Sequence, residues 1–121
     1  MTPRKVLVVD DSKLMHKMFE VMLREQTLVH AYDGREALAL LGEHGDVELM
    51  LLDINMPVMS GLEVLENLRD MGSELPVIII STEGREEDTQ RGLEAGAVAY
   101  IKKPFQAEQL REIIFKFEVP R

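Results

Sequence analysis

Five short apolar runs alternate with longer stretches of helical periodicity, and this alternation constrains the fold more than any other feature of the chain. The runs are Lys5–Asp10, Thr27–Tyr32, Glu48–Asp53, Pro76–Ser81 and Val98–Lys103. Four of them have nearly continuous apolar cores, which is typical of strands that are covered on both faces in a parallel sheet. The second run is more mixed in character, which favours a place at the edge of the sheet.

Between the runs, apolar residues recur at the spacing of amphipathic helices. Ser12 precedes the first of these stretches and is a residue type that commonly caps a helix. We interpret the methionines of that stretch as core residues. The apolar positions are Met15, Met18, Phe19 and Met22, then Ala37, Leu38 and Leu41, then Leu62, Leu65 and Leu68, and finally Leu110, Ile113, Ile114 and Phe117.

The stretch Arg85–Ala95 differs from the other four helical segments because it is polar on nearly every side. It offers only Leu93 and small residues for burial. This pattern predicts a weakly anchored helix that can move, since few buried contacts hold it. A helix that is merely exposed would have the same pattern, and the residues alone do not separate these two interpretations.

Five strands alternating with five helices predict an α/β fold with right-handed crossovers. We expect a doubly wound, five-stranded parallel sheet of the flavodoxin-like order 2-1-3-4-5; this order is taken from known sheets of the same kind. The 121 residues have the size of one domain, so residues 1–121 are expected to form a single unit.

Composition excludes several classes of function. With 14 Lys and Arg against 22 Asp and Glu, the net charge of −8 disfavours direct binding of nucleic acid or anionic membrane. The chain has no cysteine, which excludes disulfides, thiolate metal sites and cysteine nucleophiles. We find no signal peptide and no apolar run near the roughly 20 residues that span a bilayer, and we expect a cytoplasmic protein.

The histidines and glycines do not form a recognisable binding motif. His16, His30 and His44 lack metal-ligand spacing, and we interpret all three as surface or edge residues. The glycines form neither a GxGxxG nor a Walker A pattern, so nucleotide binding has no support.

Polar residues follow four of the predicted strands, at the sheet edge where doubly wound proteins bind ligands. Each residue alone has an ordinary explanation as a turn former or helix cap. Their coincidence at one edge favours a functional site, in which three carboxylates, a hydroxyl and an ammonium group share one crevice. The residues are Asp10 and Asp11 at the end of the first strand, Asp53 at the end of the third, Ser81 and Thr82 at the end of the fourth, and Lys103 at the end of the fifth.

Three crowded carboxylates repel one another, and a divalent cation would remove this conflict. Mg²⁺ prefers oxygen ligands and can neutralise a transferring phosphoryl group. Asp53 is then a candidate nucleophile that forms an acyl phosphate, with Ser81 as a hydrogen-bond donor. Lys102 and Lys103 point to opposite faces of their strand, so only one of them can contact a phosphate oxygen.

At these positions the chain resembles the receiver family of two-component signalling, from about Arg4 to Phe117. Each motif is weak alone, but their order and spacing together are specific. The motifs are Val6–Ser12, Leu52–Pro57 with Gly61, Pro76–Thr82 and Lys103–Phe105.

The resemblance implies that Asp53 is the phosphoacceptor and that Lys103 contacts the phosphoryl group. It further implies that Mg²⁺ is bound directly by Asp11, Asp53 and the backbone carbonyl of Asn55, with Asp10 acting through water. The Asn55 position also influences the lifetime of the acyl phosphate in the family.

The resemblance also assigns roles around the site. Ser81 would move toward the phosphoryl group, and Tyr100 would follow by swinging inward; without the family, Tyr100 reads as a half-buried strand aromatic. A cis peptide bond is expected before Pro104. Glu83 would modulate the phosphate lifetime, and Thr82, where many relatives carry alanine, would narrow access to the crevice.

The expected function is a phosphorylation-dependent switch. A sensor histidine kinase or a phosphotransfer protein would supply the phosphoryl group, and a downstream target protein would bind the face formed by Arg85–Ala95, the strand of Tyr100 and Gln106–Phe117. The chain would not be an enzyme in the usual sense, because it would catalyse only its own phosphorylation and slow dephosphorylation.

Two other functions fit the residues less well. An aspartyl phosphatase usually needs a second aspartate two residues after the nucleophile as general acid, and that position holds Asn55. A flavin carrier would place a phosphate near Asp10 and Asp11, which would repel it. Whether the chain acts alone or within a larger regulator stays open.

Overall fold

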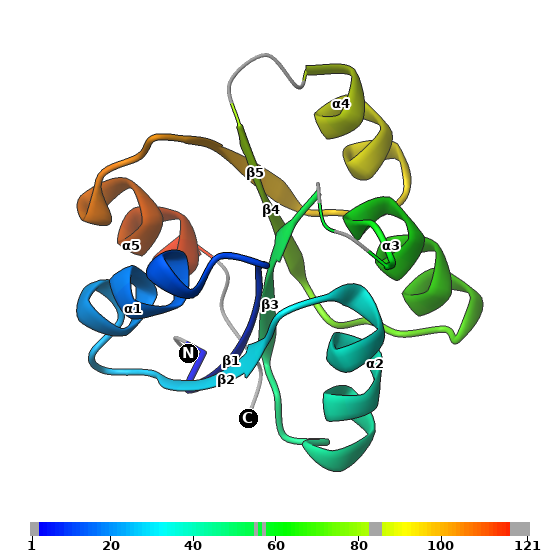
Figure 1. Cartoon of the computed structure of the whole chain (residues 1–121), viewed down its shortest axis with the longest axis horizontal. Coiled ribbons are helices and arrows are strands. Elements are labelled where there is room, and N and C mark those ends of the chain that lie inside the picture. The colour runs from blue at the N-terminus through cyan, green and yellow to red at the C-terminus, as the bar shows by residue number, and fades with distance from the viewer. Residues whose placement is uncertain (1–2, 55, 57, 83–85, 117–121) are drawn as a thin grey trace.

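The structure is a computed structural model, and it describes residues 3–54, 56, 58–82 and 86–116. The described residues form five strands and five helices in strict alternation (Figure 1). In chain order these are β1 (Lys5–Val9), α1 (Lys13–Met22), β2 (Thr27–Ala31), α2 (Gly34–Glu43), β3 (Leu49–Asp53), α3 (Gly61–Asp70), β4 (Val77–Thr82), α4 (Glu86–Glu94), β5 (Ala99–Lys103) and α5 (Ala107–Lys116).

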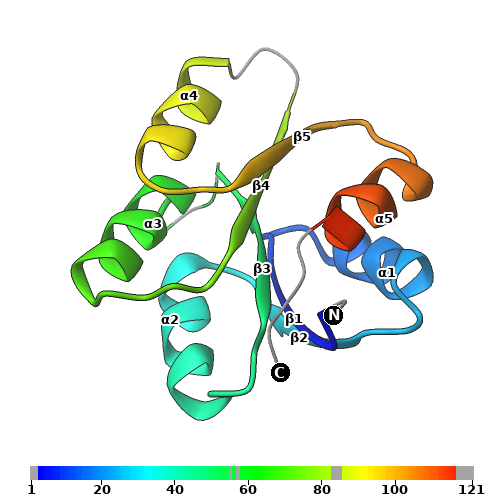
Figure 2. The ribbon, with the colours of Figure 1, turned by 180° about the vertical axis from the view of Figure 1, so that it is seen from behind.

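The strands form one sheet in the order β2-β1-β3-β4-β5, and every neighbouring pair is parallel. The expected doubly wound fold and its strand order are therefore confirmed, and β2 lies at an edge as its mixed character indicated. Helices α1 and α5 cover one face, while α2, α3 and α4 cover the other (Figures 1 and 2).

Successive strand residues enter two different cores because strand side chains alternate between the faces of a sheet. Leu52 and Ile79 pack on the side of α2, α3 and α4. Leu51 and Ile80 pack on the side of α1 and α5. Burying each such aliphatic side chain contributes roughly 1.5–3 kcal/mol to the stability of the fold. Helices pack on both faces of the sheet, so both faces need apolar side chains. This explains the continuous apolar runs in the sequence.

Side-chain caps fix where three of the helices begin. The Ser12 side chain accepts a hydrogen bond from the Met15 backbone nitrogen at 3.3 Å, which confirms the predicted cap of α1. Asp33 caps α2 and Ser60 caps α3 in the same way. The cap at Ser12 holds the start of α1 directly after the carboxyl end of β1.

Two features of the helices differ from a simple amphipathic pattern. In α1, Phe19 is buried but Met18 is exposed, so the interpretation of all three methionines as core residues is wrong for Met18. It lies one helical turn from the exposed Leu14, on the solvent side of the helix. In α4, the described residues that are buried are Thr89 and Gly92, which agrees with the small contact face expected for this segment.

Several positions named in the sequence analysis lie outside the described residues: Asn55, Pro57, Glu83, Arg85 and Phe117. Within the described part, none of the helices combines the length and apolar character that crossing a bilayer would require. The fold brings the predicted site residues, which lie at the ends of β1, β3, β4 and β5, to one edge of the sheet.

Candidate functional site

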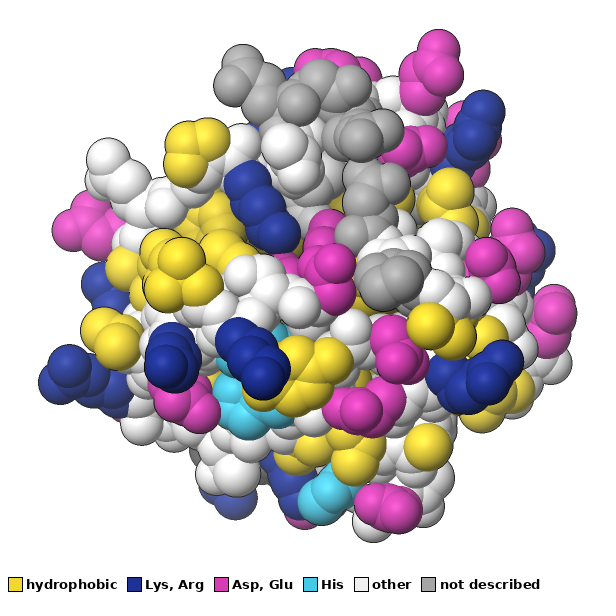
Figure 3. Space-filling view, in the orientation of Figure 1, with side chains coloured by type: hydrophobic (Ala, Val, Ile, Leu, Met, Phe, Trp, Pro, Cys, Tyr) yellow, Lys and Arg dark blue, Asp and Glu magenta, His cyan; other side chains and the backbone are white. Residues whose placement is uncertain are grey.

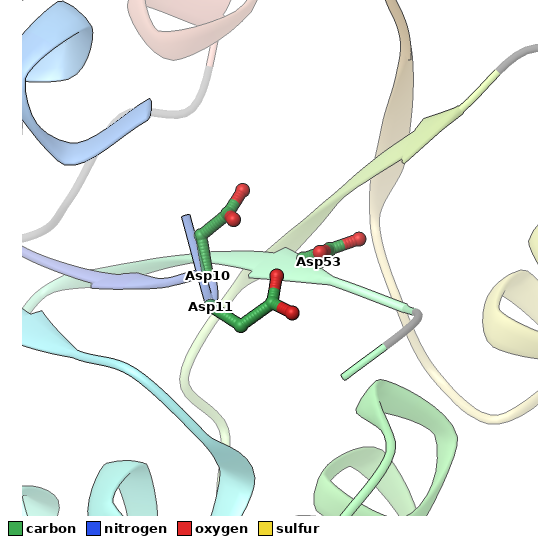
Figure 4. A group of neighbouring side chains, drawn as sticks. All are labelled: Asp10, Asp11 and Asp53. Carbon is green, nitrogen blue, oxygen red and sulfur yellow. The ribbon is translucent and has the colours of Figure 1, made fainter. Parts of the chain in front are cut away.

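Three carboxylates converge at the carboxyl edge of the sheet. Asp10 and Asp11 directly follow β1, and Asp53 is the last residue of the neighbouring strand β3. One carboxylate oxygen from each residue lies within 4.8 Å of the others. Asp10 and Asp53 are buried and Asp11 is exposed, so solvent reaches the group from the Asp11 side. Figure 4 shows the three side chains next to one another.

Lys103, the last residue of β5, adds a positive charge to this group. Its Nζ lies 3.0 Å from Asp10 Oδ2 and 3.8 Å from Asp53 Oδ2. Its neighbour Lys102 lies instead 3.4 Å from Glu86 at the start of α4. The alternation of the strand thus sends one lysine to each face, and Lys103 is the one beside the carboxylates. The peptide bond from Lys103 to Pro104 is cis, as expected.

Both carboxylate oxygens of Asp10 are already engaged. Oδ1 accepts the backbone N–H of Ser12 at 2.9 Å, and Oδ2 accepts a hydrogen bond from Lys103 at 3.0 Å. Asp10 is only 1% exposed, so these partners replace the water that a carboxylate needs. Asp11 is left as the most accessible oxygen donor of the three.

The charges of the site fit a divalent cation. Three carboxylates face one ammonium group, which leaves negative charge in excess when all are ionised. Carboxylate oxygens are the donors that hard cations such as Mg²⁺ prefer. The residues present therefore match such an ion in both charge and donor type.

Ser81 is buried near the end of β4, but its hydroxyl is engaged away from the carboxylates. Its Oγ accepts a hydrogen bond from Thr89 Oγ1 on α4 at 3.0 Å. By alternation Ser81 shares a strand face with Ile79, which packs on the side of α4. Asp53 and Lys103 share faces with Leu51 and Ile101, which pack on the opposite side. Sequence reasoning placed the Ser81 hydroxyl in the crevice and missed Thr89.

The remaining predicted residues lie around this edge. Tyr100 on β5 is 43% exposed, and Thr82 at the end of β4 is exposed. Thr82 is in register with Lys103 on the neighbouring strand. Asn55 and Glu83, predicted as a metal ligand and a modulating residue, lie outside the described residues.

The prediction that all three histidines are surface or edge residues is wrong for His16. His16 is only 2% exposed. Its Nε2 lies 2.8 Å from the backbone oxygen of Asp10, and its Nδ1 lies 2.6 Å from Nδ1 of His30. Its ring centroid is 4.3 Å from that of Tyr32. His16 is buried because these partners satisfy both ring nitrogens, and it thereby contacts the backbone of the site.

The fold and the site together define a class: an open α/β protein with a cation-compatible acidic site at the carboxyl edge of its sheet. The comparison with family models specifies it further. The model described as "Response regulator receiver domain" matches residues 6–115. The chain therefore belongs to this family and is a receiver domain of the type found in two-component response regulators.

Individual relatives agree with this assignment. The chain is 36% identical to a chemotaxis protein CheY homolog of Campylobacter jejuni, over 89% of this chain and 87% of that protein. It is 39% identical to the two-component response regulator PhoP of Pseudomonas aeruginosa, over 88% of this chain but 48% of PhoP. The chain thus corresponds to about half of that second regulator.

Solved structures show the same fold. The chemotaxis protein CheY4 of Vibrio cholerae superimposes with a TM-score of 0.84 at 33% identity, over 93% of this chain and 97% of that one. The receiver domain of NtrX from Brucella abortus gives a TM-score of 0.85 at 30% identity, over 92% and 95% of the two chains.

Proposed function

We propose that this receiver is a phosphorylation-dependent switch in which Asp53 accepts a phosphoryl group from a sensor histidine kinase or a phosphotransfer protein. The observation that carries the proposal is the grouping of Asp53 with Asp10, Asp11 and Lys103 at one sheet edge. A carboxylate beside a cation site and a fixed ammonium group has the surroundings that an aspartyl nucleophile needs.

The residues that would hold Mg²⁺ are the carboxylates of Asp11 and Asp53 and the backbone carbonyl of Asn55. Asp10 would act through a water molecule, and this is supported by the two hydrogen bonds that already occupy its carboxylate oxygens. When bound, Mg²⁺ would neutralise charge on the phosphoryl oxygens.

In the transfer step, a carboxylate oxygen of Asp53 attacks phosphorus. A P–O bond forms while the P–N bond of the donor phosphohistidine breaks, and its electron pair leaves with the ring nitrogen as the ring takes up a proton. The ammonium group of Lys103 would pair with a phosphoryl oxygen as a point charge. Transfer therefore requires the Asp53 carboxylate to be held next to the phosphorus atom and to be in its ionised form.

The chain would catalyse only this step and the slow hydrolysis of the phosphoryl group from Asp53. In hydrolysis, a water oxygen attacks phosphorus, the acyl O–P bond breaks, and inorganic phosphate leaves as the Asp53 carboxylate is restored. Asn55, Thr82 and Glu83 would influence the rate. We therefore regard the domain as a signalling switch and not as an enzyme in the usual sense.

The output would be a changed binding face on α4, β5 and α5. Phosphorylation adds charge and acceptor oxygens at Asp53, to which Ser81 and then Tyr100 would respond. Exposure of Tyr100 and the ion pair between Lys102 of β5 and Glu86 of α4 support a shared surface. A downstream protein would bind there in the cytoplasm, and the acidic net charge disfavours direct contact with nucleic acid.

Incubation with acetyl phosphate and Mg²⁺, followed by intact-mass measurement, tests the proposal. We expect one phosphoryl adduct in the wild type and none in Asp53→Asn. Asp46→Asn, which alters an exposed aspartate paired with Lys5 outside the site, should retain the adduct. An adduct that persists in Asp53→Asn would refute the assignment of the acceptor.

A further inference from the structure

We propose that Thr89 is a positioning residue that holds the Ser81 hydroxyl in the unphosphorylated protein and so connects α4 directly to the phosphoryl site. The inference deepens the proposed function and rests on it, because it concerns the response of Ser81 to a phosphoryl group on Asp53.

The contact between the two residues is short and excluded from water. Thr89 Oγ1 donates to Ser81 Oγ at 3.0 Å, and Ser81 and Thr89 are 1% and 5% exposed. A buried hydroxyl needs a partner, since water is not present to replace one. The hydrogen bond therefore favours the orientation in which Ser81 faces α4.

The packing of α4 brings this contact about. Gly92 follows Thr89 by one helical turn, and Ile79 precedes Ser81 by two strand residues on the same face. A Cβ atom at Gly92 would lie 2.1 Å from Ile79 Cδ1 and 3.6 Å from Ile54 Cδ1. A side chain at this position would displace Ile79 Cδ1, so glycine lets the helix approach β4 without disturbing that residue, and Figures 1 and 2 show α4 beside the sheet.

Thr89 is the buried residue within the first half of α4, residues 86–90. Among the described residues of the helix, Thr89 and Gly92 are the buried ones, and the first turn is acidic and mostly exposed. The ion pair between Glu86 and Lys102 is also exposed, and pairs of this kind contribute little. Loss of the Thr89 hydrogen bond should therefore loosen the first half of α4.

Phosphorylation would compete for Ser81. Asp53 pairs in register with Ile80, the residue before Ser81, so a phosphoryl group would lie close to the end of β4. An anionic phosphoryl oxygen is a stronger acceptor than a neutral hydroxyl. Ser81 would turn to it and leave Thr89, whose hydroxyl can then bond a backbone carbonyl one turn earlier. The exchange of partners would carry the signal from Asp53 into α4.

The test compares Thr89→Val, which removes the hydroxyl and nearly keeps the shape, with Thr89→Ser, which keeps the hydroxyl. The probe is beryllofluoride with Mg²⁺, a phosphoryl mimic, whose affinity is measured by ¹⁹F NMR titration. The wild type must give up one buried hydrogen bond, so we expect Thr89→Val to bind the mimic about 3- to 10-fold more tightly. Thr89→Ser should match the wild type. Unchanged or weaker binding by Thr89→Val would overturn the proposal.

A second readout needs no ligand. Amide hydrogen exchange in α4 should be about 3- to 10-fold faster in Thr89→Val and in Ser81→Ala than in the wild type, with β1 and β3 unchanged. If the wild type fails to bind beryllofluoride but α4 loosens in both variants, the proposed function fails and only the anchoring of α4 through Thr89 stands. If the wild type binds it and α4 exchange is unchanged in both variants, the role of Thr89 is refuted.

Discussion

Asp10 is the most constrained acidic residue of the site. Its backbone N–H donates to Ala31 at 3.1 Å, its backbone oxygen lies 2.8 Å from His16 Nε2, and its carboxylate accepts from Ser12 and Lys103. A buried carboxylate is tolerated only with such partners. The network fixes the end of β1, directly before Asp11.

The two adjacent lysines offer a matched comparison. Lys103→Met removes the ammonium group beside Asp10 and Asp53, whereas Lys102→Met removes an exposed charge near Glu86. We expect Lys103→Met to slow phosphorylation by acetyl phosphate by at least about 100-fold, because a fixed charge at the reacting group is lost. Lys102→Met should react at nearly the wild-type rate. Equal rates for the two variants, measured by intact mass against time, would contradict the role of Lys103.

The burial of His16 leads to a prediction about stability. His16→Leu should lower the free energy of unfolding by about 1–3 kcal/mol, because it removes the hydrogen-bond partner of the Asp10 carbonyl and of Nδ1 of His30. Urea denaturation measures this value. His44→Leu, at a partly exposed histidine that contacts Lys5, should cost less. A larger cost at His44 would show that the His16 contacts contribute little.

The acidic and basic residues at the strand ends could be predicted from the sequence. Two buried residues that contact the site, His16 and Thr89, could not. The residues Asp10, Asp11, Asp53 and Lys103 follow apolar runs, and parallel strands end at a common edge. His16 and Thr89 were missed because their partners, His30 and Ser81, belong to other elements. Only tertiary packing decides which polar residues of a helix become buried.

At the scale of elements, strand positions were predicted to within one residue at each end. The reason is that continuous apolarity stops where both covering layers stop. The order of the strands was not derivable from residue patterns and came from known sheets. Helix α1 was predicted less well, because Leu14, Met18 and Val21 form an exposed apolar row beside the buried Phe19.

The start of α3 depends on a close backbone approach. A Cβ atom at Gly61 would lie 2.5 Å from the backbone oxygen of Asp53 and 2.8 Å from Ile54 Cα. Backbone atoms at the end of a buried strand have little freedom to move, so Gly61→Ala should destabilise the fold by about 1–3 kcal/mol. It should also slow phosphorylation, since it displaces the acceptor residue.

Gly42→Ala is the control for this prediction. Gly42 lies near the end of α2, and a Cβ atom there would have no neighbour within 4 Å beyond the backbone of its own helix. Alanine at this position should therefore be neutral or stabilise the fold by up to about 1 kcal/mol. Thermal unfolding of both variants measures the difference. Equal stability of Gly61→Ala and Gly42→Ala would show that α3 can shift away from β3 at no cost.

At the scale of the whole molecule, acidic residues outnumber basic ones, but side chains of both charges are distributed over the same face. The net charge is −8. Figure 3 nevertheless shows acidic, basic and hydrophobic side chains interspersed on the face that carries the site, with hydrophobic and basic side chains together over α1. The net negative charge of the molecule attracts cations, which agrees with the proposed metal binding.

The pH dependence of stability can be followed at one surface pair. A hydrogen bond from Lys5 lowers the pKa of Asp46 below its ordinary value. A carboxyl group whose pKa is lower in the folded state stabilises the fold above its unfolded pKa of about 3.9, and this contribution is lost as the pH falls through the folded value. Asp46→Asn should therefore lower the melting temperature slightly at neutral pH.

The same difference should vanish once the pH is well below the folded pKa of Asp46, and it should shrink in high salt because the pair is exposed. Thermal unfolding of the wild type and Asp46→Asn across this pH range measures it. A difference that stays constant on acidification would mean that the charge of Asp46 does not contribute.

The central claim is that Asp11 and Asp53 form a cation site in which Asp53 is the phosphoacceptor. Calorimetric titration with Mg²⁺ tests it most directly. We expect one site in the wild type and in the surface control Asp46→Asn, and affinity at least about 10-fold weaker in Asp11→Asn, which loses a charged ligand. Absence of Mg²⁺ binding in the wild type, or unchanged affinity in Asp11→Asn, would contradict the account.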